Sequence, residues 1–162
     1  MNQQANRKSL RVYIDMDGVL CDIKAAYLEV WERDPQIEFP QSIPGIFLGL
    51  RPIPGALEVV NRLRWDTRFD VWILSAPSVK NPHCYTEKRL WVERHFDYQF
   101  AKRLILATDK SLLIGDVLVD DFDSGKGQDR FSGRLLHFGS GQFPNWRQVE
   151  ETLRSMVEGK SN

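Results

Sequence analysis

Short apolar runs recur along the chain and alternate with longer stretches in which apolar residues repeat every three or four positions. The short runs predict strands and the periodic stretches predict helices. Strands are expected near residues 10–14, 70–74, 104–107, 117–119 and 134–138. Helices are expected at about 23–33, 55–65 and 86–96, and after Asn145, where Trp146, Val149, Leu153 and Met156 form one stripe. Because strands that alternate with helices form parallel sheets covered on both faces, the pattern predicts an α/β class, a Rossmann-like doubly wound sheet.

One segment departs from this alternation. Residues 34–54 contain five prolines, which prevent long regular structure. Because the segment follows the first strand and its helix, we expect residues 23–52 to form a small helical cap over the strand ends. The core would then comprise about 9–22 and 53–160, within a single domain of 1–162.

Composition adds limits rather than a function. Equal numbers of acidic and basic residues (22 each) give no attraction to a nucleic acid polymer or an anionic membrane. No apolar run reaches membrane-spanning length, and residues 1–9 lack a signal-peptide core. Cys21 and Cys84 have no metal-binding spacing; they could pair, but a reduced cytoplasmic enzyme is the favoured interpretation.

Candidate chemistry begins where two apolar runs end in aspartates. Asp15 and Asp17 follow the first run, and Asp120 and Asp121 follow the run at 117–119. Ligands of open parallel sheets bind beyond the carboxyl ends of the strands. Two unit charges ~4 Å apart repel by ~4 kcal/mol at an effective dielectric near 20, so converging carboxylates must bind a cation, take up protons or separate. We therefore expect the four carboxylates to surround a divalent cation and to take part in phosphoryl transfer.

Three further residues offer donors to a phosphate group. Ser75 ends the second predicted strand, Lys110 follows the third, and Lys88 lies in the helix after Ser75. A carboxylate nucleophile would divide phosphate-ester hydrolysis into two easier steps through an aspartyl-phosphate. Mg²⁺ is the expected cation because it prefers oxygen ligands and needs only one or two carboxylates.

Several segments together resemble the haloacid dehalogenase superfamily of phosphatases, and within it the 5'(3')-deoxyribonucleotidases. The resemblance covers nearly the whole chain after Ser9, and its matching segments are residues 15–22, 52–56, 74–77, 88–92, 108–110 and 117–121. It implies a Mg²⁺-dependent phosphomonoesterase that hydrolyses (deoxy)ribonucleoside monophosphates. Another small phosphate ester as the substrate is the alternative, and whether the protein forms a homodimer is left open.

The resemblance also implies individual roles. Asp15 would be the nucleophile and a metal ligand, and Asp17 the acid and base, with its backbone carbonyl on the metal. Asp121 would be the third protein ligand of the metal, and Asp120 would support a metal-bound water. The phosphate would be held by Ser75, Lys110 and Lys88.

The chain differs from the subfamily pattern where the nucleoside would be bound. Ile23 replaces a base-stacking aromatic residue, Thr108 an arginine, and Ala76 a small hydroxyl residue, while Phe122 stands where a basic residue is common. Aromatic residues in the predicted cap could stack on a base or form the cap's own core. The candidates for substrate binding are Tyr27, Trp31 and Phe47.

Other interpretations fit the sequence less well. A calcium loop starting at Asp15 would need glutamate at its twelfth position, which is Ala26. The glycines around Lys126 do not satisfy the Walker pattern, and residues 123–128 have the composition of a flexible loop. A phospho-aspartate switch such as a receiver domain has its acidic pair first and its acceptor aspartate mid-chain. Here that order is reversed, which favours the enzyme.

Overall fold

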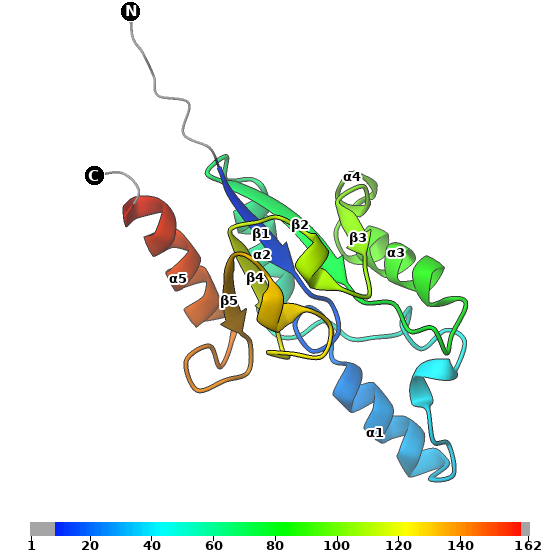
Figure 1. Ribbon diagram of the computed structural model, residues 1–162. Helices are drawn as coiled ribbons and strands as arrows, with labels where there is room; N and C mark the ends of the chain where they lie inside the picture. The colour runs from blue at the N-terminus through cyan, green and yellow to red at the C-terminus, as the bar shows by residue number, and fades with distance from the viewer. Residues whose placement is uncertain (1–8, 160–162) are drawn as a thin grey trace, which may run out of the picture.

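The computed structural model describes residues 9–159, and its centre is a five-stranded sheet (Figure 1). All neighbouring strands are parallel, and their order is β3-β2-β1-β4-β5. The strands are β1 (Leu10–Ile14), β2 (Phe69–Ser75), β3 (Leu104–Leu106), β4 (Val117–Asp120) and β5 (Arg134–His137). The predicted α/β, Rossmann-like fold is therefore confirmed, and each strand ends within one residue of its predicted position.

Within residues 9–159, five α-helices and three 3₁₀ turns accompany the strands, and the last helix follows the final strand. They are α1 (Ile23–Arg33), η1 (Pro40–Ser42), α2 (Ala56–Arg64), α3 (Cys84–His95), α4 (Tyr98–Ala101), η2 (Lys110–Leu112), η3 (Gln128–Arg130) and α5 (Trp146–Glu158). The Asn145 side chain caps α5 by accepting a hydrogen bond from the Arg147 N–H, and the helix begins directly after Asn145 as predicted. The short α4 was not predicted, because four residues are too few to show a helical period.

Side chains on the two faces of the sheet enter two different cores. On β1, Val12 and Ile14 point into the larger core with α2 and α5, whereas Tyr13 points to the other face, towards Phe131. The strands β2 and β4 alternate in the same way. This two-residue period places the ends of the central strands between two apolar layers.

The order of the strands defines where a ligand site is expected. From the central β1 the chain builds β2 and β3 on one side, and then returns to build β4 and β5 on the other. Connections therefore diverge between β1 and β4, and a crevice forms at the carboxyl ends of such strands. Asp15 directly follows β1, and Asp120 is the last residue of β4.

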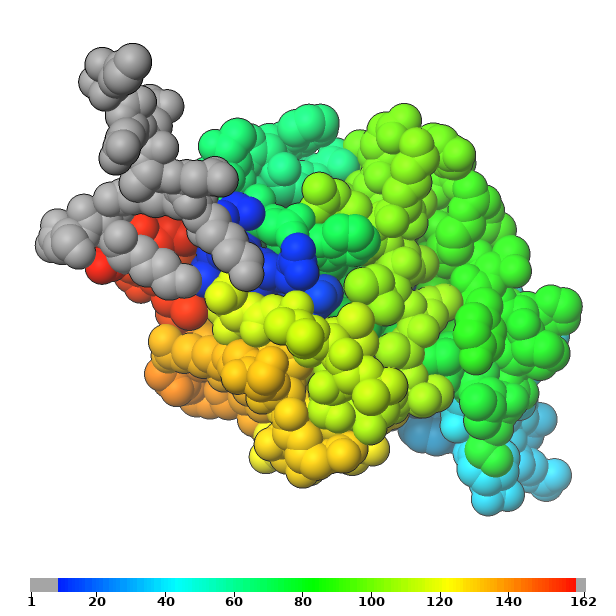
Figure 2. Space-filling view, turned by 45° about the horizontal axis from the view of Figure 1, so that its top comes forward, coloured from blue at the N-terminus to red at the C-terminus, as the bar shows by residue number. Residues whose placement is uncertain are grey.

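The segment predicted as a cap contains α1 and η1 and projects from the end of the molecule towards which β1 points (Figures 1 and 2). The part of this segment that leads back to the core, residues 45–50, is hydrogen-bonded to α3 through its backbone groups. The buried Glu87 carboxylate accepts hydrogen bonds from Gly45 N and Phe47 N, at 2.7 and 3.1 Å. Trp91 Nε1 donates to the Leu50 carbonyl. That residues 23–52 act as a cap within a single domain stays a prediction, and residues 1–8 and 160–162 lie outside the described part.

Two further features bear on the expectations from composition. None of the helices described is both long and apolar enough to cross a membrane. Cys21 and Cys84 are both buried free thiols.

Candidate active site

The loop after β1 turns sharply around a glycine. Three successive N–H groups, of Val19, Leu20 and Cys21, donate to the Met16 carbonyl. Gly18 has φ +80°, and a Cβ at this position would lie 2.1 Å from Asp121 Oδ2. Only glycine satisfies both conditions, and its absent side chain lets the Asp121 carboxylate lie against the loop.

Three of the predicted carboxylates meet at the switch point of the sheet. Oxygen atoms of Asp15, Asp120 and Asp121 all lie within 4.8 Å of one another. Burial, together with the charges of Asp15 and Asp120, raises the pKa of Asp121 to about 6. Asp121 Oδ1 is buried and has no hydrogen-bond partner among the described residues.

A buried lysine lies among these carboxylates. Lys110 is 1% exposed, and its Nζ lies 3.1 Å from Asp15 Oδ1 and donates to Asp120 Oδ2. Although burial alone lowers it, the pKa of Lys110 is raised by the charges of Asp15 and Asp120. Lys110 is therefore a permanent cation of the site.

A second buried lysine connects the loop after β1 with the end of β2. Lys88 Nζ donates to Asp17 Oδ2 at 2.7 Å, to Ser75 Oγ at 2.8 Å and to the Ala76 carbonyl at 3.0 Å. All three of its protons are thus used, and its side chain is completely buried. Lys88 holds Asp17 and Ser75 together, although Asp17 follows β1 and Ser75 is the last residue of β2.

The charges of the site do not cancel. Four aspartates (Asp15, Asp17, Asp120 and Asp121) and two buried lysines sum to −2. Lys24 adds only a distant contact, 3.9 Å from Asp121 Oδ2, and its side chain is 75% exposed. The excess charge and the unpartnered Asp121 oxygen fit a divalent cation with oxygen ligands.

Two contacts that support the carboxylates were not identified from the sequence. Gln128 Nε2 donates to Asp120 Oδ1 at 3.2 Å, and Gln128 Oε1 accepts from Lys126 N at 2.8 Å. The Lys126 carbonyl in turn accepts from Lys110 N. The glycine-rich segment 123–128 is therefore hydrogen-bonded to the site at Lys126 and at Gln128, although its composition suggested only a flexible loop.

The second contact comes from β5. His137 Nε2 lies 3.0 Å from the Asp121 carbonyl oxygen, which fixes the backbone beside the Asp121 carboxylate. Neither Gln128 nor His137 occurs in a recognisable motif, and both reach the site only through tertiary packing. Their roles therefore could not be predicted from the local sequence pattern.

The three aromatic residues predicted to bind substrate occupy different environments. Phe47 is 2% exposed and packs in the core, its ring centroid 5.1 Å from Lys88 Nζ. Tyr27 is half-buried, and burial together with the charge of Asp17 raises the pKa of its hydroxyl. Trp31 is 40% exposed, stacks edge-on against Tyr27 and donates to the Ile37 carbonyl. Substrate contact by any of them stays a prediction.

Comparison with known proteins identifies the family. Residues 36–156 match the family described as 5' nucleotidase, deoxy (pyrimidine), cytosolic type C protein. The chain belongs to this family. Through it the chain also belongs to the haloacid dehalogenase superfamily, and the resemblance found in the sequence is confirmed.

Individual relatives of this nucleotidase family match most of the chain. A protein of Vibrio phage KVP40, provisionally named a 5'(3')-deoxyribonucleotidase, is 40% identical over 149 residues, which cover 89% of this chain and 84% of the phage protein. The human cytosolic-type 5'(3')-deoxyribonucleotidase is 36% identical over 151 residues and 75% of each chain. The mouse mitochondrial enzyme of the same name is 31% identical, covering 73% of this chain and 67% of its own.

Proposed function

We propose that the protein is a Mg²⁺-dependent phosphomonoesterase that hydrolyses (deoxy)ribonucleoside monophosphates through an aspartyl-phosphate on Asp15. The observation that carries the proposal is the meeting of Asp15 with Asp120 and Asp121 at the switch point of the sheet. The names of the relatives, as nucleotidases, support the reaction class and the kind of substrate.

In the first step an Asp15 carboxylate oxygen attacks phosphorus and the bond from phosphorus to the sugar oxygen breaks. Lys110 Nζ lies within ion-pair distance, 3.1 Å, of Asp15 Oδ1 and so keeps the attacking carboxylate in place at the end of β1. The leaving sugar oxygen takes a proton from Asp17, whose Oδ1 is not engaged by Lys88. The product of this step is the free nucleoside.

In the second step water attacks the phosphorus atom of the aspartyl-phosphate. Asp17 takes the proton from that water, and the bond from phosphorus to the Asp15 oxygen breaks to release inorganic phosphate. Ser75, through its hydroxyl hydrogen, and Lys110 orient the phosphate oxygens, while Lys88, whose donors are used by Asp17, Ser75 and Ala76, adds positive charge.

The carboxylates of Asp15, Asp120 and Asp121 would hold the cation. We infer that the Asp17 carbonyl also contributes, as the resemblance implies. When bound, Mg²⁺ supplies positive charge that offsets the repulsion between the anionic ester and the carboxylates.

Phosphate release tests this proposal directly. The substrates are a panel of nucleoside 5'- and 3'-monophosphates together with sugar phosphates, each assayed with excess EDTA and again after Mg²⁺ is restored. We expect turnover of nucleoside monophosphates that stops with EDTA and returns with Mg²⁺. Full activity in excess chelator would contradict the proposed Mg²⁺ dependence. A preference for sugar phosphates would contradict the proposal that nucleoside monophosphates are the substrates.

We also propose that the protein acts in the cytoplasm, which is supported by its relative named as cytosolic. Mitochondrial relatives belong to the same family, so fractionation of the source cells is the deciding measurement. Formation of a homodimer stays a prediction that sedimentation would test.

A further inference from the structure

A cavity of about 220 Å³ lies beside the amino-terminal half of β2, away from the aspartate cluster. The short strand β3 pairs only with Ile73–Ser75, so it leaves the beginning of β2 without a strand neighbour on that side. Arg103 partly fills the gap, because its Nη1 donates to the Val71 carbonyl at 3.2 Å. The pocket is therefore a consequence of the unequal lengths of β2 and β3.

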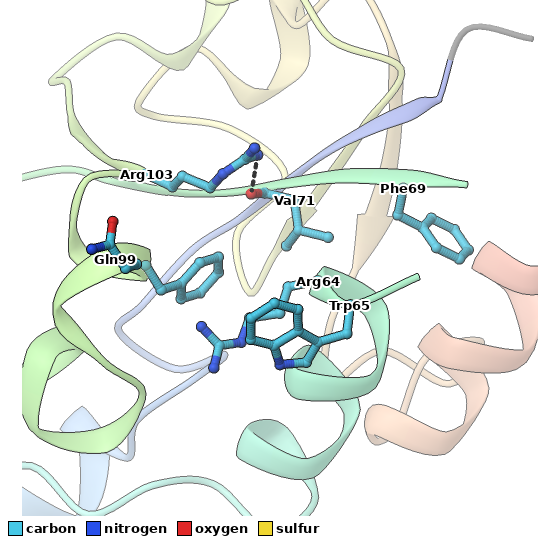
Figure 3. Close-up of a pocket in the computed structure, with 7 residues that line it drawn as sticks. Arg64, Trp65, Phe69, Val71, Gln99 and Arg103 are labelled. Atoms are coloured by element: carbon cyan, nitrogen blue, oxygen red, sulfur yellow. Dashed lines mark hydrogen bonds between the residues drawn. The ribbon is translucent and has the colours of Figure 1, made fainter. Parts of the chain in front are cut away.

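Two arginines form opposite walls of this pocket. Figure 3 shows Arg103 on one side, Arg64 with Trp65 on the other, and the Val71 side chain between them. Phe69 and Phe100 add apolar surface, and Gln99 adds an amide. The lining thus combines apolar surface with polar groups that can fix an orientation.

Both guanidinium groups are held in place yet keep unused donors. Arg64 donates through Nε to Asn61 and pairs through Nη1 with Asp97 at 2.7 Å. Arg103 uses Nη1 for both Asp70 and the Val71 carbonyl. Within residues 9–159, Nη2 of each arginine makes no hydrogen bond, so two oriented donor groups remain for a ligand.

The charge around the pocket favours an anion. Arg11 shares Asp70 with Arg103, so three arginines face the two carboxylates of Asp70 and Asp97. Their sum is +1. This part of the molecule therefore attracts a negative group, in contrast to the aspartate cluster.

An exposed aromatic ring lies at the pocket. Trp65 is 75% exposed, and its ring centroid lies 4.9 Å from the central guanidinium carbon of Arg64. An indole ring offers a flat apolar surface for stacking. The cavity volume is below the ~300–1,000 Å³ of pockets for drug-sized ligands, so the part of a ligand that enters it is limited to about one ring with one acidic group.

We propose that this pocket binds a planar aromatic ring that carries an anionic group, the ring packing on Trp65 and Phe69 and the anion on the free Nη2 groups of Arg64 and Arg103. The same chemistry occurs in aromatic carboxylates and in cyclic nucleotides, in which an aromatic base and an anionic phosphate belong to one molecule. The site is separate from the aspartate cluster and does not depend on the proposed reaction.

Calorimetric titration in EDTA tests the proposal. Four probes separate the two parts of the ligand: orotate (a ring with a carboxylate), a pyrimidine nucleoside 3',5'-cyclic monophosphate, uracil (a ring alone) and inorganic phosphate (an anion alone). The variants are Trp65→Ala and Arg103→Gln. Arg147→Gln, which removes an exposed ion pair with Glu151 on α5, is the matched arginine control. Melting curves check that each variant folds.

We expect one equivalent of orotate or of the cyclic nucleotide to bind, and the one that binds identifies the source of the ligand. Loss of a charged hydrogen bond or of the stacking surface should weaken Kd at least tenfold in Trp65→Ala and Arg103→Gln. Arg147→Gln and Asp15→Asn should bind as the natural protein does. The proposal fails if neither acid binds at millimolar concentration, if uracil or phosphate binds equally well, or if Asp15→Asn abolishes binding while Trp65→Ala does not.

Discussion

The two ends of the sheet are both rich in charged residues, but they differ in burial and in net charge. At the carboxyl end, Lys88 and Lys110 are at most 1% exposed, and the four aspartates leave an excess of −2. At the amino end of β2, the pairs of Asp70 with Arg11 and Arg103 lie at the surface, and the balance with Asp97 and Arg64 is +1.

The pKa values of single carboxyl groups reflect this contrast. Burial and neighbouring carboxylates raise the pKa of Asp121 to about 6, whereas a hydrogen bond from Arg68 lowers the pKa of Asp66 to about 2. A surface aspartate surrounded by arginines stabilises the fold modestly, while a buried group of aspartates costs stability unless a cation binds. The number of ion pairs therefore does not distinguish the candidate active site; the uncompensated buried charge does.

The strongest test of the contrast is Asp15→Asn set beside Asp70→Asn. An amide cannot act as the nucleophile, so Asp15→Asn should lower turnover by roughly 10⁴-fold or more without lowering the melting temperature. Asp70→Asn removes a carboxylate from the other end and should leave turnover within about twofold. Phosphate release and thermal unfolding monitored by circular dichroism measure both effects.

Near-natural turnover in Asp15→Asn would show that Asp15 is not the nucleophile. A comparable loss in Asp70→Asn would show that the two ends are not functionally distinct. Both variants must melt cooperatively for the comparison to count.

The strands and the strand-end aspartates could be predicted because local pattern determines them. A buried apolar run such as Val12–Ile14 predicts a strand. The residues that follow the run therefore lie at the end of that strand, whatever the rest of the fold. The role of Lys88 was harder to predict from the sequence, because a lysine on a helix surface is usually solvated. Only packing of α3 against the end of β2 buries it beside Asp17 and Ser75.

Residues that act through tertiary contacts could not be found in this way. Glu87 precedes Lys88, and its position in the sequence predicts another charge on the helix surface. Its carboxylate nevertheless accepts hydrogen bonds from two backbone N–H groups some forty positions earlier in the chain. Gln128 lies in a segment whose glycines suggest mobility, yet it supports Asp120. In both cases the partner is a long-range group that no local period encodes.

The buried lysine at the carboxyl end gives the second test. Lys88→Met keeps the volume of the side chain but leaves the Asp17 charge without its partner, so the free energy of unfolding should fall by ~3–5 kcal/mol. Lys102→Met is the matched control, because Lys102 is exposed and contacts only the Gln99 side chain and the exposed Tyr98 ring through its ammonium group among the described residues. It should change the free energy of unfolding by no more than ~0.5 kcal/mol. Urea unfolding at pH 7 measures both. Equal effects of the two substitutions would mean that burial of the lysine does not set the cost.

The smallest effect is expected at the amino end, from Asp66→Asn. Asp66 pairs with Arg68 at 2.6 Å and with Arg154 at 3.3 Å, and the hydrogen bond from Arg68 is the main cause of its lowered pKa. Because the folded pKa of about 2 lies below the ordinary value of 3.8, the stabilisation is complete above pH 4 and is lost as the pH falls towards 2.

A pair of this kind at the surface contributes ~0.2–1 kcal/mol. Asp66→Asn should therefore lower the free energy of unfolding by that amount at pH 7, and the difference from the natural protein should shrink steadily between pH 4 and pH 2. Asp129→Asn, at an exposed position, should show no such trend. Urea unfolding across this pH range measures both variants. A deficit in Asp66→Asn that persists unchanged down to pH 2 would mean that the carboxylate charge is not its source, since only the ionised form of Asp66 can pair with Arg68.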